Sequence, residues 1–360
     1  MATMKTSIGI KSRLIRDTTY YPREDLGIPQ HLLVSGFFSI QWHITNACDL
    51  HCKHCYDRSK RSPLTLEQGR KILNDLNHFC KERRVKGNVC FTGGNPFLSP
   101  IFIELYSYAV QKGFSVDILG NPVTQEQLLP VIRIRKPDLF QISLEGMEKH
   151  NDSIRGKGSF DRALRFLDLL SRLDVPSGVM LTLTDKNMGQ VLKLGKILQG
   201  KTGFLTFSRL SQVGEGARLE MPSREEYASF LVKYLKAAGK NPTLSLKDNL
   251  FNIILYKNNL PLFDGCVGFG CSPAFNTVAV LSDGEVHACR KFPSLIGNIN
   301  KKSLSRIYDS RIARRYQKGN CACAQCYVKP LCGGCMASIK SHGLDIFKDK
   351  DPYCFMEMLS

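Results

Sequence analysis

A chain of 360 residues with 43% hydrophobic content is long enough for two to three globular domains, which excludes a mainly disordered protein. Lys and Arg outnumber Asp and Glu by 50 to 32, and the net charge of +18 indicates an anionic partner such as nucleic acid, a nucleotide or an acidic peptide. No apolar run reaches the roughly 18 residues of a membrane helix, and the N-terminus lacks the apolar core of a signal peptide. We therefore expect a cytoplasmic protein, whose fourteen cysteines suit metal ligation better than disulfides.

The first part of the chain divides into a short arm and a longer region with an alternating pattern. Residues 1–36 form a basic N-terminal arm that is too short to be a domain of its own. From 37–222, apolar runs of strand length alternate with amphipathic stretches of helix length, which is typical of βα units around a parallel sheet. Six strands are predicted, at 39–45, 87–92, 114–120, 138–144, 176–183 and 203–210.

Helices are predicted between these strands. The one over 65–83 opens with Thr65 and Gln68, the spacing of a capping box. Another covers 223–239 and belongs to a bridging helical segment at 223–260. One face of the first helix carries an apolar stripe that should pack on the sheet: Leu66, Ile72, Leu73, Leu76, Phe79 and Cys80.

The last region, 261–360, has a different character. It contains nine of the fourteen cysteines, is interrupted by glycines and has too little apolar sequence for a large core. A hairpin is predicted over 276–289, because Asp283 and Gly284 are a strong tight-turn signal. Such a region normally needs metal ligation to fold, so we expect a small metal-binding domain here.

Three cysteines follow the first predicted strand with the spacing C-x3-C-x2-C: Cys48, Cys52 and Cys55. Three thiolates on a four-iron cluster leave one iron open for another ligand, which is useful for chemistry. The alternative is a zinc site completed by a histidine, since Cys3His is a common closed set. The candidate histidines are His43, His51 and His54.

The second predicted strand ends in Gly93, Gly94, Asn95 and Pro96. Together with the cysteine loop, this motif resembles the radical S-adenosylmethionine (SAM) enzymes, which usually have GGEP at this point. The resemblance implies a partial (β/α)6 barrel whose open iron binds SAM and yields a 5'-deoxyadenosyl radical. The glycines would let the backbone approach the SAM amino group, and Asn95 would be a neutral acceptor for it.

A third match lies at the fourth predicted strand. In similar proteins the residues at Ser143 and Glu145 would face the SAM ribose, and Arg155 would pair with the SAM carboxylate. The alternative is that Glu145 and Arg155 are surface residues or that they pair with each other. The glycine turn at 211–219 resembles the adenine-side loop of the family.

The cysteines of the last region resemble the SPASM extension of radical SAM enzymes that act on peptides, in which interleaved ligands hold two auxiliary 4Fe-4S clusters. By position, one cluster would take Cys266, Cys271, Cys289 and Cys335, and the other Cys323, Cys326, Cys332 and Cys354. Two C-x2-C pairs would also fit a zinc ribbon. Cys321 is a rival to Cys323, and Cys80 and Cys90 are expected to be small core residues.

The resemblance thus implies a radical SAM/SPASM maturase with three 4Fe-4S clusters that modifies a ribosomally made precursor peptide. The GGNP form is similar to maturases of thiazole/oxazole or selenium-related peptides. Its partners would be that peptide, with the basic arm free to contact an acidic leader, and a reducing donor such as flavodoxin or ferredoxin. A sulfatase-maturase-like enzyme is an alternative, although Arg290 stands where those enzymes have an aspartate base. A zinc-ribbon nucleic-acid binder would leave Arg155 and the GGNP motif unexplained, so nucleic acid and membrane are not expected partners.

Overall fold

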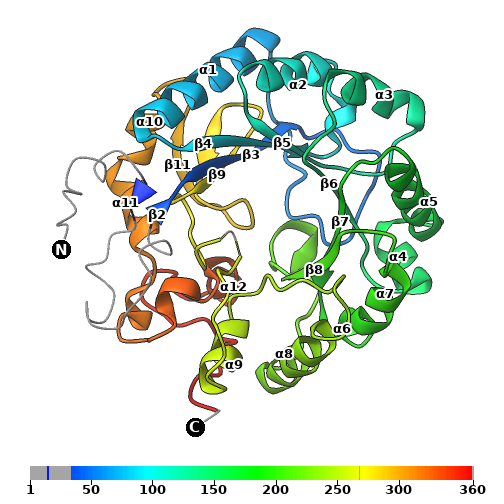
Figure 1. Ribbon diagram of the computed structural model, residues 1–360. Helices are drawn as coiled ribbons and strands as arrows, with labels where there is room; N and C mark the ends of the chain where they lie inside the picture. Colours follow the sequence, from blue (N-terminus) through cyan, green and yellow to red (C-terminus); the bar gives the residue numbers. More distant parts are fainter. Residues whose placement is uncertain (1–13, 16–33, 267, 359–360) are drawn as a thin grey trace, which may run out of the picture.

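The computed structural model describes residues 14–15, 34–266 and 268–358. Nine strands form one sheet in the spatial order β11-β10-β9-β3-β4-β5-β6-β7-β8 (Figure 1). All six predicted strands are confirmed, and they pair in parallel in chain order. They are β3 (Phe37–Thr45), β4 (Lys86–Gly93), β5 (Ser115–Leu119), β6 (Leu139–Ser143), β7 (Ser177–Leu183) and β8 (Phe204–Arg209). The sheet curves as an open barrel with β8 and β11 at its edges, which confirms the predicted α/β partial barrel.

Helices cover the outside of this curved sheet (Figure 1). Along the barrel they are α1 (Leu66–Arg83), α2 (Phe102–Gln111), α3 (Gln125–Ile134), α4 (Glu148–Arg155), α5 (Ser159–Arg172), α6 (Asp185–Met188) and α7 (Val191–Leu198). The bridging segment holds α8 (Arg224–Ala238) and α9 (Phe251–Lys257). Short 3-10 turns are η5 (Pro96–Leu98) and η6 (Gly214–Arg218).

The first helix forms as its sequence predicts. Thr65 accepts the Gln68 amide at 3.2 Å, and the Gln68 side chain accepts the Thr65 amide at 3.0 Å, so the capping box is present. The predicted stripe is buried against the sheet from Ile72 to Cys80, whereas Leu66 is half-buried at the edge of the core. Aromatic rings continue this core, as where Phe38 of β3 packs on Phe79 with centroids 4.6 Å apart.

The predicted hairpin is present and extends the barrel sheet. It consists of β9 (Thr277–Val280) and β10 (Glu285–His287), followed by the antiparallel β11 (Leu295–Asn298). Gly284 has φ 84°, as the tight turn requires. The sequence did not predict that β9 pairs in parallel with β3, with Ser39 opposite Thr277. The predicted boundary between 260 and 261 therefore separates two stretches of chain that contribute to one sheet.

The remainder of the C-terminal region is made of short elements. They are α10 (Leu304–Tyr308), α11 (Arg311–Lys318), η7 (Cys321–Cys323), η8 (Lys329–Leu331) and α12 (Met336–Ser341). A buried ion network connects them to the barrel: Arg209, at the end of β8, lies 2.8 Å from Asp248 and 2.8 Å from Asp351. The side chains of Tyr227 and Tyr353 flank its guanidinium group at 5.7 and 5.6 Å.

Most of the predicted basic arm lies outside the described residues. The part that is described pairs β1 (Leu14–Ile15) with β2 (Val34–Ser35) in antiparallel fashion. In the described ranges, every helix is too short or too polar to cross a membrane.

Candidate functional site: a cavity between two cysteine sets

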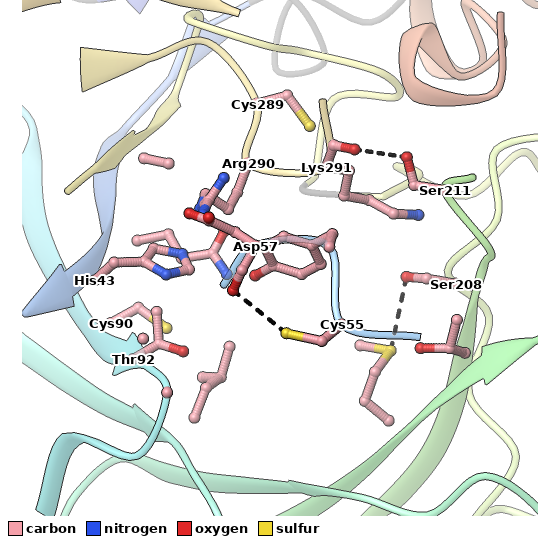
Figure 2. Close-up of a pocket in the computed structure, with 18 of the residues that line it drawn as sticks. His43, Cys55, Asp57, Cys90, Thr92, Ser208, Ser211, Cys289, Arg290 and Lys291 are labelled. Carbon is pink, nitrogen blue, oxygen red and sulfur yellow. Dashed lines mark hydrogen bonds and ion pairs between the residues drawn. The ribbon is translucent and has the colours of Figure 1, made fainter. Parts of the chain in front are cut away.

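Most of the predicted site residues gather where the parallel strands end, around a cavity of about 1090 Å³. Active sites of parallel barrels lie at this end, because the loops after the strands converge there. Figure 2 shows Cys55 from the first cysteine loop and Cys289 from the C-terminal region on opposite sides of this space. The cavity thus connects the two chemical regions of the sequence.

The glycines at the end of β4 hold the start of the cysteine loop. The amide of Gly94 donates to Thr45 O at 2.9 Å, and the amide of Asn95 donates to Ala47 O at 2.8 Å. A Cβ atom on Gly93 would lie 2.0 Å from Thr45 O, and one on Gly94 would lie 2.1 Å from Ala47 O. Any other residue would push the two backbones apart, so the glycines are needed here whether or not they also approach SAM.

Asn95 has protein partners for both polar atoms of its buried side chain. Its Oδ1 accepts the amide of Phe97 at 3.3 Å, which caps the turn that Pro96 begins, and its Nδ2 donates to Asp49 Oδ1 at 3.1 Å. The expected hydrogen bond from the SAM amino group to Asn95 stays a prediction. The observed bonds give the residue a structural role in the loop.

Glu145 and Arg155 form a buried ion pair, with Arg155 Nη1 3.0 Å from Glu145 Oε1. Glu145 also accepts the Thr182 amide at 2.8 Å, and His54 Nε2 lies 2.9 Å from Oε1. Burial alone would raise the pKa of Glu145, but His54 and then Arg155 lower the pKa to about 2. Arg155 lines the cavity and Glu145 lies behind it. The pairing that the sequence left open is therefore present, and the predicted SAM contacts of both residues stay predictions.

Two further polar residues, Asn121 and Asp49, extend this network, and their role was not predicted from the sequence. Asn121, just beyond β5, accepts from Arg155 at 3.1 Å and donates to Asp49 Oδ1 at 2.7 Å. Its amide nitrogen is also 3.5 Å from Cys48 Sγ. Asp49 in turn accepts from Asn95, so a continuous chain of hydrogen bonds runs from the GGNP motif to Arg155. The position of Asn121 at a strand end was the signal available in the sequence. Ser143, the last residue of β6, lines the cavity as expected.

The loop after β8 packs on the other side of the cysteine loop. The amide of Glu215 donates to Cys55 O at 2.9 Å. Gly214 has φ 58°, and a Cβ atom there would lie 2.7 Å from Cys55 O and from Tyr56 O. The cysteine loop is thus held by the backbone on both sides, and the adenine contact expected of the 211–219 loop stays a prediction.

Of the eight C-terminal cysteines assigned to the two auxiliary clusters, four line the same cavity as the first loop: Cys266, Cys271, Cys289 and Cys335. Burial raises the pKa of the Cys271 thiol, and Cys335, Cys289 and Cys266 are near enough to raise it further. Burial likewise raises the pKa of Cys289 to about 11. The structure therefore brings together the set of four that the sequence proposed for one auxiliary cluster.

The other four surround a small separate cavity: Cys323, Cys326, Cys332 and Cys354. Burial raises the pKa of Cys332, and the other three members raise it further. Cys321 is exposed and does not line this cavity, so the geometry favours Cys323 over its rival. Among the described residues, no three His, Cys, Asp or Glu side chains converge as ligands of a single ion. Each thiolate of a four-iron cluster binds a different iron, so thiols spread around a cavity fit such a cluster.

Ion pairs fasten the cysteine loop to the C-terminal hairpin. Arg290 pairs with Asp57, as Figure 2 shows, and Arg61 lies 2.6 Å from Asp283 and 3.0 Å from Glu285. Asp57 and Arg61 both follow Cys55, whereas their partners lie on or beside β9 and β10. The hairpin therefore fixes the position of the first loop relative to the cysteines at 266–289.

The two remaining cysteines differ in their environments. Cys80 is buried in the hydrophobic core, which confirms the expectation for it. The expectation for Cys90 was wrong: it is half-buried on the inner face of β4 and lines the cavity (Figure 2). Side chains alternate between the two faces of a strand, and the inner face of this open barrel is polar space rather than core.

Comparison with known proteins agrees with this geometry. Residues 42–196 match the radical SAM superfamily, and residues 271–336 match SPASM, an iron-sulfur cluster-binding domain. The mycofactocin maturase MftC of Mycolicibacterium smegmatis is 30% identical over 88% of this chain and 82% of its own length. The AdoMet-dependent heme synthase of Methanosarcina barkeri is 24% identical over 88% of this chain and 95% of its own. The structure of Streptococcus suis SuiB bound to the precursor peptide SuiA superposes with a TM-score of 0.70 at 16% identity, covering 89% of this chain and 76% of that one.

The chain belongs to the radical SAM superfamily and carries a SPASM domain. It is therefore a radical SAM enzyme, and its cofactors are SAM and more than one 4Fe-4S cluster.

Proposed function

We propose that this enzyme modifies a ribosomally synthesised peptide by abstracting a hydrogen atom from one of its residues. The observation that carries this proposal is the single cavity shared by Cys48, Cys52 and Cys55 on one side and by the first auxiliary set on the other. A substrate that reaches the SAM loop through this space also lies beside the auxiliary cysteines. The likeness to MftC, which is named a maturase, supports a peptide as the substrate.

The cysteine loop would hold a cluster with one open iron, and the two sets of four would hold two auxiliary clusters. SAM bound at the open iron would supply the hydrogen-abstracting radical. Arg155 lines the cavity and is the cation that would bind the SAM carboxylate. Glu145 and Asn121 bond to Arg155 directly, and Asp49 bonds to Asn121, so these three residues hold the arginine in place. Gly93, Gly94, Asn95 and Pro96 position the loop that carries the cluster ligands.

Two lysines make the cavity attractive to an acidic part of the substrate. Lys247 and Lys291 line it, and their Nζ atoms contact carbonyl oxygens, those of Cys266 at 3.3 Å and Arg209 at 2.6 Å. Neither lysine forms an ion pair with another residue that the structure describes, so a carboxylate entering the cavity would not have to displace one. This supports a peptide with an acidic segment.

The sulfatase-maturase alternative fits the site less well. Arg290, which follows Cys289, points toward Asp57 and covers the Tyr56 ring at 4.9 Å. Asp57 also lies 3.7 Å from Arg61, so this carboxylate is held between two cations. Burial alone would raise the pKa of Asp57, but hydrogen bonds from Ser59, followed by Arg290 and Arg61, lower it. A carboxylate held in this way is a poor general base.

The test is anaerobic reaction of the reconstituted enzyme with peptides encoded by short reading frames beside its gene, read by mass spectrometry. A mass change that requires SAM and is lost in Cys335→Ala would support the proposal. In that variant, 5'-deoxyadenosine should still form without product. Modification of no candidate peptide, with SAM cleavage intact, would count against a peptide substrate from this set of genes.

Porphyrin chemistry is a second candidate, because the AdoMet-dependent heme synthase is matched over 95% of its length. The same anaerobic assay with Fe-coproporphyrin III in place of peptide separates the two functions. Heme formation would favour the porphyrin, and its absence beside a modified peptide would favour the first proposal.

A further inference from the structure

A strongly basic surface lies on α10 and α11, away from the cavity lining. It consists of six exposed cations, which we call the α10–α11 basic face: Lys301, Lys302, Arg306, Arg311, Arg314 and Arg315. The only carboxylate between 301 and 315 is Asp309, which already pairs with Arg83 and lies 3.8 Å from Arg314. The face therefore keeps most of its positive charge, which favours an anionic partner.

The three arginines of α11 share one side of the helix. Arg311, Arg314 and Arg315 occupy positions i, i+3 and i+4, while Ala313 and Tyr316 are buried on the opposite side. In Figure 1, α10 and α11 lie beside β11 and the end of α1, on the outer surface of the molecule. The charges are thus presented outward from helices that are anchored in the fold.

Packed side chains connect this face to the regions that carry the auxiliary cysteines. The guanidinium carbon of Arg315 lies 4.0 Å from the centre of the Phe347 ring, and the carbonyl of Phe347 accepts the amide of Cys321 at 2.9 Å, at the start of η7. Tyr316 packs on Phe347 with centroids 5.1 Å apart. Tyr316 also packs on Phe292 with centroids 6.3 Å apart, and Phe292 lines the main cavity together with Cys289. Through Phe347 and Phe292, α11 is thus connected to η7, which ends at Cys323, and to the cavity wall beside Cys289.

We propose that the α10–α11 basic face docks a small acidic one-electron donor protein of the flavodoxin or ferredoxin type. This inference rests on the proposed radical SAM function, because each reductive SAM cleavage consumes one electron. In the transfer, the donor is oxidised by one electron and a cluster of this chain is reduced by one, with no bond made or broken at the face. Of the possible anionic partners, an electron donor fits this face best, because electron transfer requires a position close to the clusters. A precursor peptide must instead enter the cavity, and nucleic acid has no need of a redox centre.

The first test measures binding of purified flavodoxin to the reconstituted enzyme by calorimetry at low ionic strength. Charge reversal in Arg311→Glu/Arg314→Glu should weaken binding about tenfold or more. The matched control, Arg162→Glu/Arg165→Glu on α5, reverses two exposed arginines with the same i, i+3 spacing and should bind as the parent does. The difference should fade in about 1 M salt, where charges are screened within about 3 Å.

The second test compares two reductants for 5'-deoxyadenosine formation. With reduced flavodoxin, the Arg311/Arg314 variant should be about tenfold slower than the parent. With dithionite, which needs no docking, it should equal the parent. Lys301→Glu/Lys302→Glu, in the loop before α10, provides a second variant and should show the same split.

Unchanged flavodoxin binding in both variant pairs would overturn the proposal. So would loss of binding to duplex DNA or to a polyglutamate peptide while flavodoxin binding persists, since that result assigns the face to another partner. A parent enzyme that cleaves no SAM even with dithionite would instead contradict the proposed function. The binding measurement does not depend on that activity.

Discussion

At the scale of single residues, Asn95 differs most from its expected role. The sequence suggested a neutral acceptor for SAM, and the structure gives it two protein partners, the Phe97 amide and Asp49. An acidic residue at this point would face the Asp49 carboxylate at hydrogen-bond distance. The asparagine is therefore explained by its neighbour in the cysteine loop, which the sequence alone could not identify because the two residues are 46 positions apart.

Asn95→Asp should disturb the first cysteine loop. The substitution removes the 3.1 Å hydrogen bond from Asn95 to Asp49 and places a second carboxylate beside Asp49. The loss of a hydrogen bond to a charged group costs about 1.5 to 3 kcal/mol. We expect a lower free energy of unfolding by about 2 kcal/mol and weaker SAM binding. Asn88→Asp is the matched control: Asn88 donates to Asp117 at 3.0 Å on the inner face of the barrel, so it should lose similar stability and keep its SAM affinity. Equal SAM affinity in both variants would contradict a loop-specific role.

Gly94→Ala should remove the first cluster and leave the auxiliary clusters. The new Cβ would lie 2.1 Å from Ala47 O and 2.6 Å from Ala47 C, so the loop that carries Cys48 must move. We expect a loss of about four irons per chain. Gly189→Ala is the control, because nothing lies within 4 Å of a Cβ there. Iron analysis of both proteins after anaerobic reconstitution decides the matter, and a Gly94→Ala protein with the parent's iron content would show that the loop tolerates the shift.

At the scale of elements, local signals predicted well and non-local pairing did not. The six parallel strands and the capped helix α1 follow from hydrophobic periodicity and from Thr65 with Gln68, which act within a few residues. The hairpin follows from Asp283 and Gly284. Its parallel pairing with β3 joins Ser39 to Thr277, and no short-range pattern records such a contact. The misjudged position of Cys90 has the same origin, because which face of β4 is core depends on what fills the barrel.

The ion pair between Arg61 and Asp283 should couple the cysteine loop to the hairpin. Both side chains are largely shielded from water, with 17% and 25% of their surface exposed. A double-mutant cycle with Arg61→Met and Asp283→Asn should give a coupling energy of about 1 kcal/mol, measured by denaturant unfolding. The exposed pair Lys201 and Asp168 is the control and should give about 0.3 kcal/mol. Additive effects of the first pair would mean that the loop is held without it.

At the scale of the whole molecule, the sequence divided the cysteines as the structure groups them. The family resemblance placed Cys289 with Cys335 across 46 residues, a pairing that hydrophobic periodicity alone would not predict. The ion pairs that join the loop to the hairpin were not predictable, because Arg61 and Asp57 look like ordinary surface charges in the sequence. The buried ion network of Arg209 with Asp248 and Asp351 was not predictable from the sequence for the same reason.

Arg209→Met should destabilise the junction between the barrel and the C-terminal region. Asp248 and Asp351 are 8% and 3% exposed, and removing their shared cation leaves two buried carboxylates without it. Breaking a buried pair costs about 3 to 5 kcal/mol, so we expect a clearly lower denaturation midpoint by circular dichroism. Because Asp351 lines the small cavity surrounded by the second auxiliary set, iron content should fall as well.

A rescue variant distinguishes unpaired charge from lost packing. Adding Asp248→Asn and Asp351→Asn to Arg209→Met neutralises both carboxylates and keeps an acceptor for the amides of Leu250 and Tyr353, which Asp248 and Asp351 accept at 2.9 and 3.0 Å. The triple variant should recover part of the midpoint, because replacing a whole buried ion network is tolerated better than breaking it. A triple variant less stable than Arg209→Met would show instead that the arginine acts mainly through its contacts with Tyr227 and Tyr353.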